Sequence, residues 1–177
     1  MAKARQEGSP FDYVNELGNG KEATGKRMLR EIETRLETLT DLQMELLIFG
    51  DLETQKSIAF LAVCKTYAFI RDFVVEVLRE KSLVFDYDLT EGDYITFFRR
   101  KNEQHPEMDE ITEKTTNKVK QVCFRILEQS GLINNIKERT IQPQLLDSTT
   151  INAISQDNPD WLKVFLYSDM DIVSYAE

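Results

Sequence analysis

The sequence predicts a mainly α-helical protein, with an N-terminal helical bundle and a C-terminal winged helix-turn-helix-like region that carries a short β-hairpin. Three observations lead to this fold class. Apolar residues recur at helical spacing in residues 23–39, they cover more than one face of residues 52–81, and in residues 112–143 an amphipathic helix passes through a glycine into a hairpin-like stretch. With 177 residues, of which 41% are hydrophobic and 30% charged, the chain is long enough for one large core or two small ones.

We expect three segments along the chain. Residues 1–22, which hold three of the seven glycines, form a flexible N-terminal arm. Residues 23–85 form a helical bundle domain, and residues 86–177 form a winged-helix-like domain with an acidic helical tail. The boundary falls in residues 83–89, where apolar and acidic side chains alternate and the backbone is either extended or a linker.

The bundle domain begins with a helix over residues 23–39, whose apolar face lies opposite a basic face. Thr40 offers a side-chain cap for a second, short helix, which Gly50 ends. Residues 52–81 follow as one or two helices. Because their apolar side chains cover more than a narrow stripe, we place them at the centre of the bundle.

The winged-helix-like domain begins with a helix that Thr90 and Asp93 start. Pro106 opens a short second helix, and Thr112 caps a long third one that Gly131 stops. The core face of the long helix is expected at Val119, Val122, Cys123, Ile126 and Leu127.

Two short strands, residues 132–136 and 140–142, complete the winged helix and are joined by a three-residue turn. The acidic tail then holds a helix capped near Ser148. A final helix follows, with Asn158 as its cap and Pro159 in its first turn.

Basic residues are concentrated in the winged helix. The chain has a formal net charge of -9, yet residues 112–143 contain six basic residues against three acidic ones. A uniformly acidic protein repels a phosphate backbone, whereas a segregated basic stripe allows the counterion release that drives binding. We therefore expect double-stranded DNA as a partner.

In a helix-turn-helix, the second helix of the pair enters the major groove with its N-terminal residues on base edges. The residues expected there combine lysines with hydroxyl and amide side chains: Lys114, Thr115, Thr116, Asn117, Lys118, Lys120 and Gln121. At the tip of the hairpin, Lys137 and Arg139 would reach adjacent phosphates. A second basic contact is expected from Lys26, Arg27 and Arg30. The alternative is that the same fold serves protein contact and the stripe is a solvated helix face.

No residue pattern indicates catalysis. The single histidine, His105, lies in a polar turn, glycine-rich phosphate loops are lacking, and the acidic pairs have no metal-binding histidine nearby. Cys64 and Cys123 fall on apolar helix faces, as small buried hydrophobes do. We therefore expect a non-enzymatic protein without a cofactor or a metal ion.

Charged residues interrupt the longest apolar stretch, residues 58–78, so we expect no membrane-spanning helix. Residues 1–10 are polar where a secretory signal would be apolar. The two cysteines fit a reducing compartment. We therefore expect a cytoplasmic protein.

The phrase EATGKRMLREIETRLETL, residues 22–39, resembles the N-terminal signature of the BrxA family of bacteriophage exclusion (BREX) systems. Further similar positions follow in order: Asp72, Phe73, Glu76, Val77, Asp93, Tyr94, Phe97 and residues 116–132. The resemblance implies an all-helical core similar to the antitermination factor NusB, a capacity to bind DNA, and a non-enzymatic role in phage defence beside other BREX proteins. Family members have also been labelled inner-membrane proteins, against which the interrupted apolar stretch argues.

Two other functions stay open. One is a scaffold or adaptor within the defence complex, whose protein-facing surface lies around Trp161 in the acidic tail. The other is an RNA-binding factor, which the likeness to NusB raises. The sequence does not predict the oligomeric state.

Overall fold

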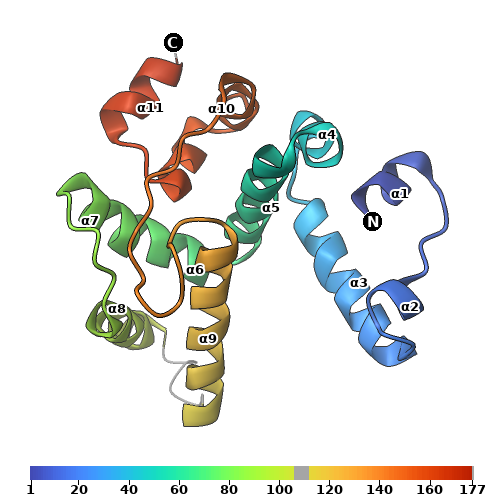
Figure 1. Ribbon diagram of the computed structural model, residues 1–177, viewed down its shortest axis with the longest axis horizontal. Helices are drawn as coiled ribbons and strands as arrows, with labels where there is room; N and C mark the ends of the chain where they lie inside the picture. Colours follow the sequence, from blue (N-terminus) through green and yellow to red (C-terminus); the bar gives the residue numbers. More distant parts are fainter. Residues whose placement is uncertain (106–111, 177) are drawn as a thin grey trace. The chain divides into compact units, whose positions relative to one another are not determined.

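A computed structural model describes residues 1–105 and 112–176 of the chain and is mainly helical, as predicted (Figure 1). The chain divides into two compact units, Met1–Tyr67 and Ala68–Glu177. The short helix expected to begin at Pro106 lies outside the described residues. A NusB-like arrangement of the helices stays a prediction.

Helices of the first unit are α1 (Ala2–Glu7), α2 (Tyr13–Glu16), α3 (Glu22–Leu36), α4 (Asp41–Phe49) and α5 (Leu52–Thr66). The segment expected as a flexible arm therefore carries α1 and α2. α2 packs on α3 beside Gly25, where a Cβ atom would lie 2.4 Å from the carbonyl oxygen of Tyr13. Only glycine allows this close approach of the two backbones.

A polar cluster joins the turn between α3 and α4 to α5. The predicted cap at Thr40 is present as a capping box, in which Thr40 and Gln43 exchange side-chain-to-backbone hydrogen bonds. The fully buried Gln43 side chain also accepts a hydrogen bond from Lys65 Nζ at 2.8 Å. The same amine donates to the carbonyl oxygen of Thr38 at 2.9 Å. These bonds fix the register of the turn on α5.

The second unit starts with a continuous helix formed by α6 (Ala68–Phe73), the π-helical η1 (Val74–Arg79) and α7 (Glu80–Leu83) (Figure 1). η1 packs against the 3-10 helix η3 (Pro159–Phe165), and Arg79 Nε donates to the carbonyl oxygen of Tyr167 at 2.8 Å. Residues 68–85 therefore belong with the C-terminal part of the chain, whereas the sequence placed the boundary between residues 85 and 86.

α8 (Glu91–Gln104) and α9 (Glu113–Gln129) complete an aromatic core with α6. The ring of Phe73 lies 5.4 Å from that of Tyr94 and 6.3 Å from that of Phe124, centroid to centroid. Val122, expected in the core, is 44% exposed. Phe124 takes the inward position instead, because its ring packs on Tyr94 at 5.7 Å. The buried residues of α9 are Cys123, Phe124 and Leu127.

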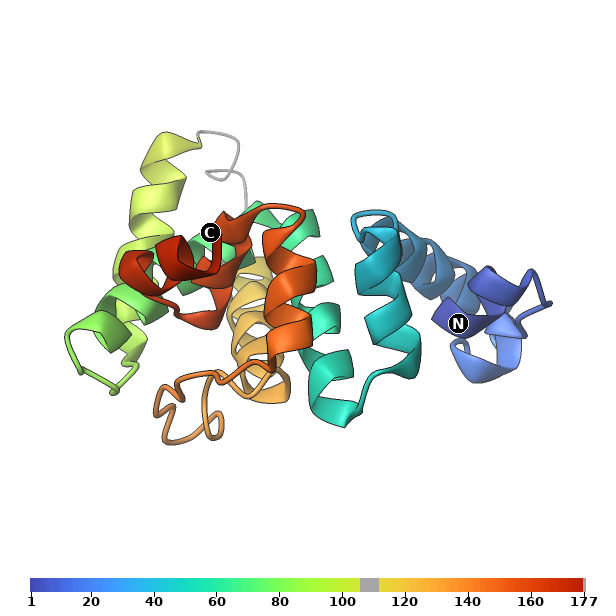
Figure 2. The ribbon, with the colours of Figure 1, turned by 90° about the horizontal axis from the view of Figure 1, so that it is seen from above.

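The predicted β-hairpin is wrong. Residues 132–142 form a loop, and the described part of the chain contains single bridges, such as Ile133 with Ile141, but no strand (Figure 2). The side chain of Asn134 accepts the N–H of Thr140, and that of Asn135 accepts the N–H groups of two residues in the turn. Because these amide side chains engage the backbone, the ladder does not extend beyond isolated bridges.

The tail contains α10 (Ser148–Ser155), which Asp147 caps, and η3, which Asn158 caps with Pro159 in the first turn. Both starts agree with the sequence, although η3 is a 3-10 helix. α11 (Asp169–Ala176), which the sequence did not predict, packs on η3.

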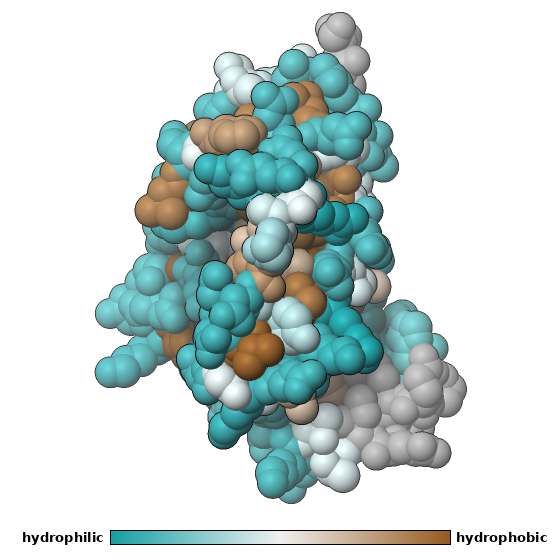
Figure 3. Space-filling view, turned by 90° about the vertical axis from the view of Figure 1, so that its right-hand side faces the viewer, coloured by the Kyte–Doolittle hydropathy of each residue, from teal (hydrophilic) through white to brown (hydrophobic). Residues whose placement is uncertain are grey.

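No helix within the described residues is long and apolar enough to cross a membrane. On the face shown in Figure 3, hydrophilic side chains predominate and apolar ones form small separate patches.

Candidate nucleic-acid interface

One face of α9 carries most of the polar residues of the predicted recognition helix. Lys114, Asn117, Lys118 and Gln121 are exposed and follow i, i+3, i+4, i+7 spacing, which places them on one side of the helix. Arg125, also exposed, extends this face by one turn, although the sequence did not place it at the interface. We call these five residues the α9 ridge.

Thr112 begins α9 as predicted, because its hydroxyl accepts the N–H of Thr115 at 3.3 Å. The hydroxyls of Thr112 and Thr115 lie 3.0 Å apart, and that of Thr116 donates to the carbonyl oxygen of Thr112 at 3.3 Å. Both predicted threonines thus bond within the first turn. Thr115 is exposed and Thr116 is half-buried.

The basic side chains of the ridge are available for a ligand. Within residues 1–105 and 112–176, no carboxylate forms an ion pair with Lys114, Lys118 or Arg125. Glu113 lies beside them and helps to line a shallow depression on this face. The ridge therefore presents three positive charges to solvent in a chain whose net charge is -9.

Lys120 does not belong to the ridge. It is half-buried, and its Nζ lies 2.5 Å from Oε1 of Glu91 in the first turn of α8. The hydrogen bond from Lys120 and its positive charge hold the pKa of the Glu91 carboxyl below its usual value. The structure thus places this predicted contact in an ion pair between α8 and α9.

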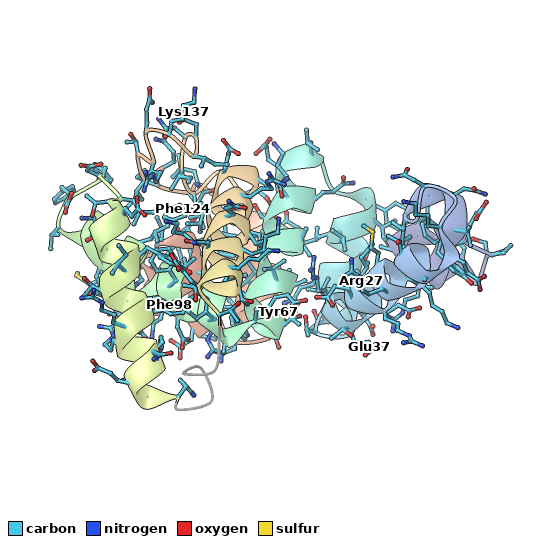
Figure 4. All side chains as sticks on the ribbon, turned by 90° about the horizontal axis from the view of Figure 1, so that it is seen from below. Arg27, Glu37, Tyr67, Phe98, Phe124 and Lys137 are labelled. Carbon is cyan, nitrogen blue, oxygen red and sulfur yellow. The ribbon has the colours of Figure 1, made fainter. Side chains whose placement is uncertain are left out.

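The 132–142 loop separates its two predicted contacts. Lys137 is exposed at the outer end of the loop (Figure 4), and no ion pair engages it within the described residues. Arg139 lies over the ring of Phe124 with its guanidinium carbon 5.2 Å from the ring centroid. Its φ of 58° lies in the left-handed region. Lys137 therefore faces solvent, while Arg139 packs the loop against α9.

The second predicted basic contact lies on α3 in the first unit. Lys26, Arg27 and Arg30 are all exposed there. Arg27 also lines a hollow of about 400 Å³ along α3 together with Glu31 and Arg35. Glu31 in this hollow is paired with Arg35 at 3.3 Å.

Two candidate chemistries can be compared with the described residues, a metal site and a cysteine nucleophile. These residues contain no group of three or more His, Cys, Asp and Glu side chains that could hold a metal ion. Burial raises the pKa of the Cys123 thiol to about 12, which makes it a poor nucleophile at neutral pH.

Sequence reasoning missed three residues of this region. Arg125 could have been found, because it lies i+4 from Gln121 on the same helical face. Glu91 and Phe124, which engage Lys120 and Arg139, could not, because both contacts depend on how α8, α9 and the loop pack together.

The helical fold and the exposed ridge define a helical protein with a candidate nucleic-acid surface. A model of the BrxA family matches residues 12–158. A protein of Bacillus cereus (strain H3081.97) named BREX protein BrxA is 31% identical over 134 residues, which cover 75% of this chain and 67% of that protein. A second BREX protein BrxA, from Paramagnetospirillum magneticum (strain ATCC 700264 / AMB-1), is 22% identical over 152 residues, or 86% of this chain and 76% of that protein.

The chain therefore belongs to the BrxA family, as the resemblance of residues 22–39 predicts. Its fold also matches the crystal structure of an uncharacterized protein from Magnetospirillum magneticum with a TM-score of 0.77. That match has 21% sequence identity and covers 93% of this chain and 88% of the other.

Proposed function

We propose that this protein is a non-enzymatic, DNA-binding component of a BREX-type phage-defence system that acts in the cytoplasm beside other BREX proteins. The α9 ridge lies in the major groove, and Lys137 contacts an adjacent phosphate. The observation that carries this proposal is the set of basic side chains, Lys114, Lys118, Arg125 and Lys137, that are exposed and have no carboxylate partner in the described residues.

The dimensions and chemistry of α9 support this docking. A helix of 17 residues is about 25 Å long, and the major groove, about 12 Å wide, admits one helix. Asn117 and Gln121 can each donate and accept hydrogen bonds, as readers of adenine do, while the lysines and Arg125 meet phosphates or guanine. Four phosphate contacts predict a slope of about -3.6 for log K against log salt concentration.

A salt titration of duplex binding tests the proposal. Lys118→Gln should weaken binding several-fold at low salt and reduce the slope by about 0.9, because one phosphate contact is lost. The matched control is Lys163→Gln, since Lys163 is paired with Asp160 at 2.7 Å. Equal curves for both variants and the unmodified chain would show that DNA binds at another surface. If structured RNA competes better than duplex DNA, the ligand of this surface is RNA.

The tail supports a second candidate function, a scaffold within the defence complex. Met170 and Val173 on α11 are 85% and 61% exposed, and Asp169 and Asp171 lie beside them. An acidic, apolar helix face suits a protein partner better than a phosphate backbone. A pull-down of neighbouring BREX proteins with nuclease present separates the two functions, because a contact bridged by DNA disappears and a direct one persists.

A further inference from the structure

Two apolar features of the second unit are not explained by DNA binding. The first is the turn after α7, where Leu83, Val84 and Phe85 are consecutive and exposed. Val84 and Phe85 are 72% and 80% exposed. Such a run at a surface is typical of a contact site, because burying three adjacent apolar side chains against a partner is more favourable than leaving them in water. We call residues 83–85 the apolar tip.

The tip is held in one conformation. The N–H of Val84 donates to the carbonyl oxygen of Lys81 at 3.2 Å, and the N–H of Phe85 donates to that of Ser82 at 3.0 Å. Phe85 has a φ of 62°, in the left-handed region that an aromatic residue rarely adopts. A fixed turn that displays a ring loses little conformational freedom when the ring is bound.

The second feature is a hollow of about 180 Å³ between α6 and α9. Val122, displaced from the core, forms part of its apolar wall. Pockets for drug-sized ligands measure about 300–1,000 Å³, so this hollow suits one large side chain better than a small molecule. Its lining residues are Phe69, Ile70, Lys118, Val119, Val122 and Cys123.

The tip of a chain cannot fill the hollow of the same chain. Phe69 and Leu83 lie at opposite ends of the continuous helix formed by α6, η1 and α7. They are 14 positions apart, which corresponds to about 20 Å of helix. A tip that fills the hollow must therefore belong to a second molecule.

Charge favours the tip of a second copy of this chain. The exposed carboxylate of Asp88 follows the tip, while that of Asp86 is paired with Lys81 at 2.5 Å. Lys118 lies at the edge of the hollow and Lys114 one turn away. A tip docked in the hollow of a second copy therefore brings a carboxylate near a lysine, which is favourable. A contact between two tips would instead bring carboxylates together, which is unfavourable.

We propose that the apolar tip of one copy docks in the hollow between α6 and α9 of a second copy, with Phe85 in the hollow and Asp88 facing Lys118. Tip and hollow are different surfaces, so the contact is head-to-tail and each bound copy leaves one tip and one hollow open. The contact is small, and the association is correspondingly weak. It involves no nucleic acid and does not depend on the proposed function.

Sedimentation equilibrium without nucleic acid tests the proposal. The average mass of the unmodified chain should rise above the monomer value of 20.6 kDa as concentration increases toward ~1 mM. Phe85→Gly removes the ring and relieves the left-handed strain, so it should fold at least as well and stay monomeric. Val122→Asp fills the hollow with a charge at an already exposed position and should also stay monomeric.

A mixture of the two variants gives the decisive result. Phe85→Gly keeps an intact hollow and Val122→Asp keeps an intact tip, so together they should form a dimer of twice the monomer mass and nothing larger. Ile95→Asp on α8, where the side chain is 41% exposed against 44% for Val122, should associate like the unmodified chain. A chain that stays at 20.6 kDa throughout, a Phe85→Gly variant that still associates, or a mixture without dimer would overturn the proposal.

Discussion

Lys120 Nζ and Glu91 Oε1 lie 2.5 Å apart, so a lysine at the middle of α9 is bound by the first turn of α8. The sequence assigns Lys120 to the DNA surface, but the carboxylate of Glu91 competes for the same charge that a phosphate would need. Glu91 thus limits how many positive charges α9 presents on this side.

We expect Glu91→Gln to strengthen DNA binding. The change releases Lys120 and removes a negative charge, so affinity at low salt should rise several-fold and the salt slope should steepen by up to about 0.9. Loss of an acid from the first turn of α8 also lowers stability slightly, because a carboxylate there interacts favourably with the helix dipole. The measurement is a duplex titration at several salt concentrations, with Glu103→Gln on α8 as the control. Unchanged binding would show that Lys120 does not reach the duplex even when released.

An ion cluster around the buried Lys101 predicts acid sensitivity. Lys101 Nζ donates to Asp72 at 2.7 Å and to Glu76 at 2.8 Å. Burial by itself raises the pKa of Asp72, but the hydrogen bonds from Lys101 and Arg71 outweigh burial and hold this pKa below its usual value. A lowered pKa contributes stability above the unfolded value of about 3.9, and this contribution is lost as pH falls through the folded-state value.

The free energy of unfolding should therefore fall as the pH drops below about 5, and Asp72→Asn should flatten that part of the curve. Lys101→Met should destabilise the protein by about 1 kcal/mol near neutral pH, because it removes the cation that Asp72 and Glu76 share while Arg71 and Arg100 still pair with them. Urea unfolding at a series of pH values measures both effects. If the free energy of unfolding of Asp72→Asn falls with decreasing pH as steeply as that of the unmodified chain, other groups cause the acid sensitivity.

Two glycines predict opposite results for the same substitution. A Cβ at Gly25 meets the carbonyl oxygen of Tyr13 at 2.4 Å, whereas at Gly92 its nearest neighbour is Thr90 Oγ1 at 3.5 Å. Gly25→Ala should cost about 1–3 kcal/mol because α2 must move away from α3. Gly92→Ala should stabilise the protein by up to about 1 kcal/mol, since alanine favours the helix and finds room. Thermal or urea unfolding compares them, and a neutral Gly25→Ala would mean that α2 does not pack closely on α3 in solution.

Local signals in the sequence were enough to predict four of the helix starts in the described residues. Thr40, Thr90, Thr112 and Asn158 cap helices as expected, because a cap depends on residues within one turn of chain. The exposed ridge of α9 follows in the same way from helical spacing, although the spacing alone did not distinguish Val122 from Phe124 as the inward residue.

Features that depend on tertiary packing were not predicted. The 132–142 loop has the apolar pattern of a hairpin, but the side chains of Asn134 and Asn135 compete for its backbone N–H groups. Residues 68–85 look continuous with the preceding apolar run, yet Arg79 bonds Tyr167 far along the chain. A period of 3.6 residues reveals an apolar face but not the element that covers it.

The two basic residues of the 132–142 loop should separate in their effects on DNA binding and stability. Lys137 extends into solvent, so Lys137→Ala should reduce the salt slope by about 0.9 and leave the free energy of unfolding within about 0.5 kcal/mol of the unmodified value.

Arg139 covers the ring of Phe124 at 5.2 Å, so Arg139→Ala should lower stability by about 0.5–2 kcal/mol through the lost cation–π contact, with a smaller effect on the slope. Arg139→Gly relieves the left-handed φ of 58° and should recover part of that stability without restoring any DNA contact. Parallel urea unfolding and salt titrations of the three variants test the assignment. A larger slope change in Arg139→Ala than in Lys137→Ala would mean that Arg139 leaves Phe124 to bind phosphate in the complex.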